Sequence, residues 1–158
     1  MLLVADSSAL ITLAACDALD LLERLFDRVR VPKVVRHEVV VPGKPFAVEL
    51  QEFLRGKAEE VNLQHFVIAA GGLGQGELEA MALVRLLNAD LLLIDDRRAR
   101  AVAEINEIKS VGSLGILVLA KRKGLISKIR PYIDRIQASQ IYLGPDVVAE
   151  VLRAADEA

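Results

Sequence analysis

Hydrophobic residues in this chain alternate between short continuous runs and longer stretches in which they recur every three or four positions. The clearest short runs are Leu2–Ala5 and residues 89–94, and neither shows the regular polar alternation of a strand with one face in water. Strands that are buried on both faces have this pattern in parallel sheets. The stretches between the runs have helical spacing. We therefore expect an α/β fold in which a parallel sheet has helices on both faces.

Turn residues and apolar spacing give the bounds of the other elements. Further strands are expected at residues 29–31, 60–63 and 108–111. Helices are expected at residues 9–15, 18–26, 32–41, 45–56, 77–88, 97–106 and 113–123, and from residue 125 onward with breaks at Pro131 and at Gly144-Pro145. A glycine-rich loop, residues 71–76, precedes the helix at 77–88.

Size and composition favour one globular domain. A chain of 158 residues fits a single core, so residues 1–158 are expected to form one domain. The single cysteine, Cys16, cannot form an intrachain disulfide, which suits a reducing cytosol. No apolar run approaches the roughly 18 residues of a membrane span, and the stretch before Cys16 lacks the Lys or Arg of a lipoprotein leader. We expect a cytoplasmic protein with no membrane partner.

Aspartates follow both of the clearest strands. Asp6 comes directly after Leu2–Ala5, and Asp95 and Asp96 come directly after residues 89–94. Open parallel sheets bind ligands outside the carboxyl ends of their strands, where the strand order reverses. The same residues also suit helix N-caps, and one of the doublet is expected to be a cap.

Two glutamates extend this set of candidates. Glu38 is placed within the apolar stripe of the helix at residues 32–41, where a charge is costly unless it pairs with an arginine or binds a cation. Glu77 opens a helix directly after Gly76, a position that the helix dipole favours in any protein. Glu79 faces elsewhere on that helix and is expected to be solvated.

Carboxylates that share one cleft require a counter-charge. Two such charges about 4 Å apart repel by roughly 4 kcal/mol at an effective dielectric constant near 20. A hard divalent cation removes this repulsion, and a set of oxygen ligands suits Mg²⁺ or Mn²⁺. Cys16, His37 and His65 show no zinc-ligand spacing. Residues 71–76 lack the features of a phosphate-binding loop or a dinucleotide fingerprint, and Ser8 stands where a phosphatase of the haloacid dehalogenase type has its second aspartate.

Basic residues gather in two places, although the formal net charge of the whole chain is −2. Arg97, Arg98 and Arg100 follow the aspartate doublet, where they either hold phosphate oxygens of a nucleic acid or neutralise the carboxylates. The second group lies toward the C-terminus and is typical of a solvated face; it comprises Lys121, Arg122, Lys123, Lys128, Arg130 and Arg135.

Taken in order, the acidic segments resemble the PIN-domain family. They are Asp6-Ser7-Ser8 after the first strand, Glu38 in a valine-rich helix, Gly76-Glu77 at the start of an alanine-rich helix, and Leu-Leu-Ile before Asp95-Asp96. The segment Gly112-Ser113-Leu114-Gly115 before a helix also resembles this family. The branch that fits best is the group of small prokaryotic proteins related to VapC-type toxins of toxin–antitoxin pairs. The resemblance covers about residues 1–143.

The resemblance implies a three-layer fold with a central parallel sheet of four to five strands. It also implies a Mg²⁺- or Mn²⁺-dependent endoribonuclease with RNA as substrate, a homodimer, and an antitoxin protein as partner. Asp6, Glu38 and Glu77 match the first three acidic positions of the family, and either Asp95 or Asp96 matches the fourth. The residues expected to contact substrate are Ser7, Ser8, Arg97, Arg98 and Ser113.

One departure from the family keeps a second function open. Glu77 stands where other members have aspartate, and its longer side chain favours a water-mediated role in metal binding. A site weakened in this way can survive as a surface of a non-catalytic module that binds RNA or a protein.

Overall fold

The structure is a computed structural model that describes residues 1–63 and 72–158. In these residues five parallel strands form one sheet, in the order β3-β2-β1-β4-β5. The strands are β1 (Leu2–Ala5), β2 (Arg28–Pro32), β3 (Ala58–Glu59), β4 (Leu91–Leu93) and β5 (Ser110–Val111). The central strand β1 has β2 on one side and β4 on the other, so the strand order reverses there.

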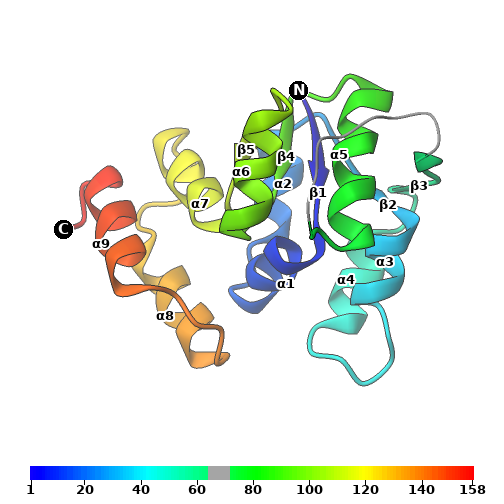
Figure 1. Cartoon of the computed structure of the whole chain (residues 1–158). Coiled ribbons are helices and arrows are strands. Elements are labelled where there is room, and N and C mark those ends of the chain that lie inside the picture. Colours follow the sequence, from blue (N-terminus) through cyan, green and yellow to red (C-terminus); the bar gives the residue numbers. More distant parts are fainter. Residues whose placement is uncertain (64–71) are drawn as a thin grey trace.

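Helices lie on both faces of this sheet (Figure 1). The described helices are α1 (Ser7–Ala15), α2 (Leu19–Leu25), α3 (Lys33–Val39), α4 (Ala47–Phe53), α5 (Gln75–Leu87), α6 (Arg97–Ile105), α7 (Ser113–Arg122), α8 (Arg130–Ala138) and α9 (Pro145–Ala154). Figure 1 shows α8 and α9 at one end of the molecule; α9 packs against α7, and α8 packs against α1. The α/β architecture predicted from the sequence is confirmed.

Each central strand contributes side chains to two separate hydrophobic cores. Leu3 of β1 faces the core that holds α1, α2 and α7, whereas Val4 faces the core that holds α5 and α6. Both side chains have no exposed surface. This arrangement explains the continuous apolar runs, because a strand covered on both faces has no position for a polar residue.

The edge strand and several helix starts differ from the sequence prediction. Strand β3 lies at Ala58–Glu59, not at residues 60–63, and among the described strands it pairs with β2 at the edge of the sheet. Pro32 is the last residue of β2 and precedes α3 instead of opening it. Helix α4 begins at Ala47, two residues after Pro45, because Phe46 has a left-handed backbone with φ of 64°. Turn residues mark the region of such a boundary more accurately than its position.

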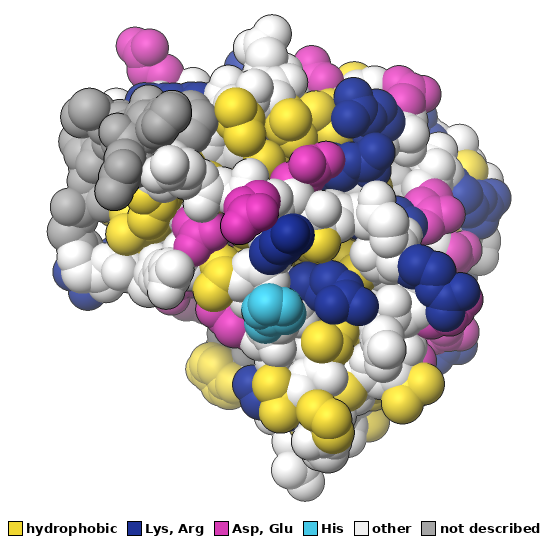
Figure 2. All heavy atoms as spheres, turned by 90° about the vertical axis from the view of Figure 1, so that its right-hand side faces the viewer, with side chains coloured by type: hydrophobic (Ala, Val, Ile, Leu, Met, Phe, Trp, Pro, Cys, Tyr) yellow, Lys and Arg dark blue, Asp and Glu magenta, His cyan; other side chains and the backbone are white. Residues whose placement is uncertain are grey.

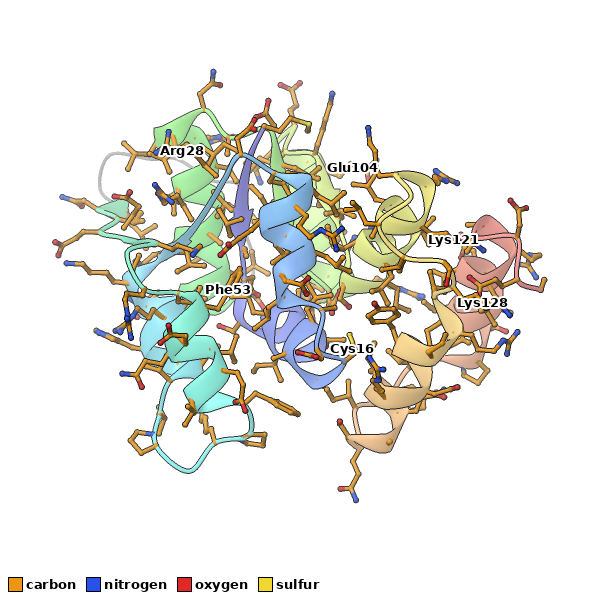
Figure 3. All side chains as sticks on the ribbon, turned by 180° about the vertical axis from the view of Figure 1, so that it is seen from behind. Cys16, Arg28, Phe53, Glu104, Lys121 and Lys128 are labelled. Carbon is orange, nitrogen blue, oxygen red and sulfur yellow. The ribbon has the colours of Figure 1, made fainter. Side chains whose placement is uncertain are left out.

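Among the described residues, the helices are all too short or too polar to cross a membrane. Cys16, labelled in Figure 3, lies in the core where α1 approaches α8. Burial raises the pKa of its thiol to about 12. The backbone oxygen of Cys16 accepts a hydrogen bond of 3.4 Å from Arg135 of α8. Cys16 is therefore a protonated core residue that joins two helices.

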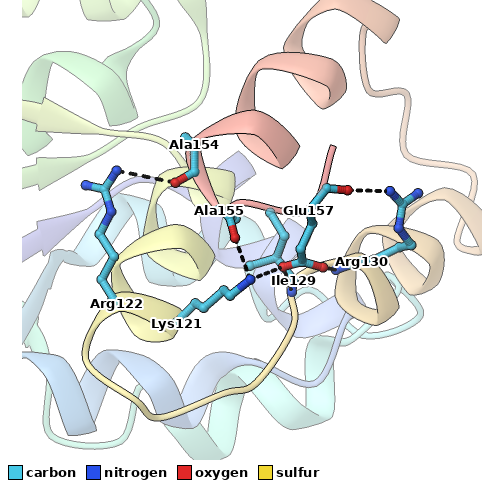
Figure 4. Close-up of polar contacts among 7 residues, drawn as sticks. All are labelled: Lys121, Arg122, Ile129, Arg130, Ala154, Ala155 and Glu157. Carbon is cyan, nitrogen blue, oxygen red and sulfur yellow. Dashed lines mark hydrogen bonds and ion pairs between the residues drawn. The ribbon is translucent and has the colours of Figure 1, made fainter.

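The C-terminal helices are held by one buried glutamate (Figure 4). The Glu157 side chain is 8% exposed and accepts hydrogen bonds from Lys121 Nζ at 3.0 Å and from the backbone N–H groups of Ile129 and Arg130 at 2.7 and 3.2 Å. Lys121 also donates to the carbonyl of Ala155. Burial raises the pKa of Glu157, but these donors outweigh burial and hold the pKa below its ordinary value.

Three residues of the second basic group make structural contacts at this junction. Lys121 and Arg130 bind the end of the chain, since Arg130 also donates to the Glu157 carbonyl at 2.8 Å. Arg122 donates to the Ala154 carbonyl at 3.4 Å, at the same junction. These contacts tie α7 and the start of α8 to the end of α9 and the residues that follow it.

We expect Glu157→Gln to lower the free energy of unfolding by about 1–3 kcal/mol, because charge-assisted hydrogen bonds to a buried acceptor are lost. The lowered pKa means that the contribution of the carboxylate is present above the ordinary glutamate value and is lost as pH falls through the folded-state pKa. Urea denaturation of both proteins should therefore show a difference at neutral pH that shrinks in acid. Asp134→Asn, on the exposed surface of α8, is the control and should leave stability unchanged. An equal effect of the two substitutions would contradict the role of Glu157.

Candidate acidic site

Asp6 lies at the point where the strand order reverses. Its backbone N–H donates to Leu93 O at 2.9 Å, which joins the end of β1 to the end of β4. The residue is 5% exposed. It occupies the N-cap position of α1, but its side chain makes no capping hydrogen bond. Capping therefore does not explain this buried carboxylate.

The environment of Asp6 disfavours its negative charge. Burial is the largest cause and raises the pKa, and the charges of Glu77, Glu38 and Asp96 raise it further. The backbone N–H of Ser7 acts in the opposite direction, and the resulting pKa is about 6 instead of 3.8. Four carboxylates predicted from the sequence are therefore close enough to interact.

Glu38 reaches this cluster from α3. Its Oε2 accepts a hydrogen bond of 2.6 Å from Ser7 Oγ, across the junction of α1 and α3. Gly76 of α5 lies against the same side chain, because a Cβ atom at Gly76 would be 3.0 Å from Glu38 Oε1. The predicted burial of Glu38 in the apolar stripe is wrong. Val35 and Val39 face the core, and Glu38 is exposed and directed toward α1.

Glu77 lies in the first turn of α5. Its Oε2 accepts a hydrogen bond of 3.2 Å from the backbone N–H of Gly74, so the carboxylate also caps its own helix. Glu79 is 7% exposed and accepts from Gln75 Nε2 at 2.7 Å. The prediction that Glu79 is solvated is therefore wrong. Glu79 lies on the side of α5 that packs against the rest of the protein. The hydrogen bond from Gln75 lowers the free-energy cost of burying its carboxylate.

The aspartate doublet divides between two tasks. Asp95 accepts from Ser113 N at 2.6 Å and from Ser113 Oγ at 2.8 Å, and these bonds join the end of β4 to the start of α7. Asp96 caps α6 through a bond of 2.8 Å from the Ala99 N–H, and its charge acts on Asp6. Asp96 is therefore the member of the doublet that faces the acidic cluster.

The predicted substrate contacts lie in different environments. Ser7 is bound to Glu38, and Ser113 is 1% exposed beside Asp95. Ser8 and Arg97 are exposed. Arg98 is also exposed, and its guanidinium lies against Gly72, where a side chain would leave no room for it. Of the glycine-rich segment, Gly71 lies outside the described residues, as does His65, and residues 75 and 76 belong to α5.

A groove of about 760 Å³ begins beside the aspartate doublet. Ser8, Asp96 and Arg97 line it on one side, and Tyr142 and Val147 line it on the other. The segment that carries Tyr142 was not among the site candidates predicted from the sequence. The available signal was weak, consisting of one aromatic residue just before the break expected at Gly144-Pro145.

The residues of the cluster fit a hard divalent cation by their chemistry. All the donors are carboxylate oxygens, and a cation would relieve the repulsion that disfavours the Asp6 charge. Among the described residues, the structure has no group of three or more acidic, histidine or cysteine side chains already arranged to hold a metal ion. Figure 2 shows acidic side chains near the centre of the face on which α3 and α5 lie, bordered by basic ones.

Comparison with protein families matches residues 2–157 to one family model, described as DUF3368: PIN domain. The match covers nearly the whole chain, and this protein belongs to the PIN-domain family. The membership predicted from the order of the acidic segments is thereby confirmed. Searches of curated proteins and of solved structures find no significant match.

Proposed function

We propose that this protein is a Mg²⁺- or Mn²⁺-dependent ribonuclease that hydrolyses phosphodiester bonds of RNA. Family membership supports a nuclease, since PIN domains are generally nucleases. The observation that carries the proposal is the buried carboxylate of Asp6, on which the charges of Glu38, Glu77 and Asp96 converge. A buried carboxylate in such surroundings is costly as an anion unless a positive charge lies beside it.

In this proposal the carboxylates of Asp6 and Asp96 would hold the cation, and those of Glu38 and Glu77 would complete the site. A bound Mg²⁺ or Mn²⁺ supplies an activated water and neutralises charge that develops on the phosphate. The chain's own groups hold these ligands in place. Ser7 Oγ orients Glu38, the Gly74 N–H orients Glu77, and the Ala99 N–H orients Asp96.

Asp95 is assigned a positioning role, because both of its oxygens already accept bonds from Ser113. Arg97 is exposed next to Asp96 and is placed to hold a phosphate oxygen of the RNA. Arginine binds such oxygens through a planar fork of N–H donors.

We assign the protein to the toxin-like members of the family, acting as a homodimer in the cytoplasm and inhibited by an antitoxin protein, on the strength of the order of its acidic segments. A non-catalytic PIN module that binds RNA or a protein is the second candidate. The observation that favours it is Glu77, whose carboxylate is already used to cap its own helix.

Calorimetric titration with Mn²⁺ tests the proposal without knowledge of the RNA target. The wild type should bind Mn²⁺ in the micromolar-to-millimolar range, and Asp6→Asn should lose this binding because a buried ligand is replaced by a neutral amide. Asp134→Asn, which is exposed on α8, is the matched control and should bind as the wild type does. Absence of binding in the wild type would overturn the metal-dependent function and favour the non-catalytic module.

A further inference from the structure

The groove beside the acidic cluster is formed by segments that are far apart in the sequence. One wall consists of the residues that follow β4, strand β5 and the start of α7. The other wall consists of the segment between α8 and α9 and the first turns of α9. Its volume of about 760 Å³ lies within the range of roughly 300–1,000 Å³ that is typical of ligand pockets. The groove is thus large enough for a group the size of a nucleotide.

Tyr142 gives the second wall an exposed aromatic ring. Tyr142 is 84% exposed, and Val147, which also lines the groove, is 38% exposed. The other tyrosine of the chain, Tyr132, differs in that it packs against the core and lies under the Arg135 guanidinium at 5.4 Å. Tyr142 thus has no comparable structural role within the described residues. An exposed ring at the edge of a groove is suited to stacking against a planar ligand.

Two arginines face the groove from the opposite wall. Arg97 and Arg100 are both exposed and line it, and the Arg100 guanidinium lies close to Gly112. Neither forms an ion pair with any residue in the described part of the chain. Their charges are available to an anionic ligand.

The acidic residues of the groove also bear on which ligand it fits. Asp95 is bound by Ser113, and Asp96 belongs to the acidic cluster, so Glu150 of α9 is the remaining carboxylate that lines the groove. The wall with Tyr142 and Glu150 therefore suits a base, which has an apolar face and N–H donors at its edge. The wall with the arginines suits a phosphate.

We propose that this groove binds one unpaired nucleotide of the RNA, adjacent to the phosphate that is cut, with its base stacked on Tyr142 and its phosphate held by Arg97 and Arg100. The proposal rests on the proposed function in that RNA is the substrate. A base can stack on Tyr142 only when it is free of its own helix, so the protein selects single-stranded RNA at this position.

Tyrosine fluorescence offers a direct readout, because the chain has no tryptophan and two tyrosines. In a Tyr132→Phe protein, Tyr142 is the only tyrosine. We expect a single-stranded RNA oligonucleotide to quench this emission in the Asp6→Asn background, in which the RNA stays uncut. A duplex of the same sequence should quench it far less. Binding without quenching would overturn the stacking contact.

Binding measured by fluorescence anisotropy provides the second test. In the Asp6→Asn background, Tyr142→Ala should bind single-stranded RNA about 5- to 150-fold more weakly, which is the range for loss of one stacked base. Tyr142→Phe keeps the ring and should bind as its parent does. Equal affinity of the alanine and phenylalanine variants would overturn the proposal.

These outcomes separate the nucleotide groove from the nuclease. Metal-dependent cleavage with no effect of Tyr142→Ala overturns only the groove. RNA binding that depends on Tyr142, without cleavage by the wild type, supports the groove and overturns the nuclease. Absence of RNA binding by the parent protein overturns both and points instead to a protein ligand.

Discussion

In EDTA at mildly alkaline pH, Asp6→Asn is expected to raise the free energy of unfolding by up to about 3 kcal/mol. The wild type must hold an anion at a site where burial and three neighbouring carboxylates raise the pKa of Asp6 to about 6 from 3.8. A pKa difference of this size between the folded and unfolded states corresponds to about 3 kcal/mol of unfolding free energy. Asparagine has nearly the same shape as aspartate and carries no charge. The substitution should therefore stabilise the protein while it removes the metal site.

The same difference in pKa determines how stability depends on pH. Because the pKa of Asp6 is raised in the folded state, its stabilising contribution is fully present below the ordinary value of 3.8 and is lost as pH rises through about 6. Wild type and Asp6→Asn should therefore differ little in acid and most at alkaline pH. Thermal or urea unfolding in EDTA across this range measures the difference, with Asp134→Asn as control.

Addition of Mn²⁺ should reverse the order of stability. A cation that binds the folded wild type raises its unfolding free energy by mass action, and the variant lacks the ligand needed for this effect. If Asp6→Asn is less stable than wild type in EDTA at every pH, the carboxylate is stabilised by contacts other than a cation.

The largest effects on activity are expected for two single substitutions, Asp96→Asn and Asp6→Asn. Each should slow RNA cleavage by more than the roughly 10- to 100-fold that loss of an outer partner of a metal ligand costs. Asparagine at position 96 can still accept the Ala99 N–H bond, so α6 should remain capped. Single-turnover cleavage of labelled RNA at saturating Mn²⁺ measures this loss of activity.

Asp95→Asn is the matched comparison for Asp96→Asn. Asparagine at position 95 weakens the bonds with Ser113 at the start of α7, so stability should fall, while folded protein should keep more activity than Asp96→Asn. The reverse order of activities would show that Asp95, not Asp96, is the ligand, and would require the two side chains to exchange their tasks when RNA and metal bind.

The sequence was sufficient to predict a parallel sheet with its central strands and the four carboxylates that interact around Asp6. Continuous apolar runs require cover on both faces. Asp6 follows the first of these runs, so its position at the carboxyl end of the strands could be inferred. The sequence could not show that Glu38 turns away from the core, since Val35 and Val39 alone complete the apolar stripe of a short helix. The division of tasks between Asp95 and Asp96 depends on Ser113, which lies on another element.

The groove could not be predicted from the sequence for a related reason. Tyr142 lines the same groove as the aspartate doublet only because α9 packs against α7 and α8 against α1, an arrangement that the bonds of Glu157 support. A pattern within one segment carries no information on which distant segment will face it.

The central position of β1 also constrains how the chain can be made. The Leu2 N–H bonds the Asp90 carboxylate across 88 positions of sequence, and Leu3 lies opposite Leu91 on the neighbouring strand. During synthesis, β1 can therefore pair with β2 early but must wait for β4 before its second edge is covered. Until then the nascent chain presents a hydrophobic strand edge of the kind that promotes aggregation. The nascent chain therefore stays open to aggregation through this edge until β4 has been synthesised and has paired with β1.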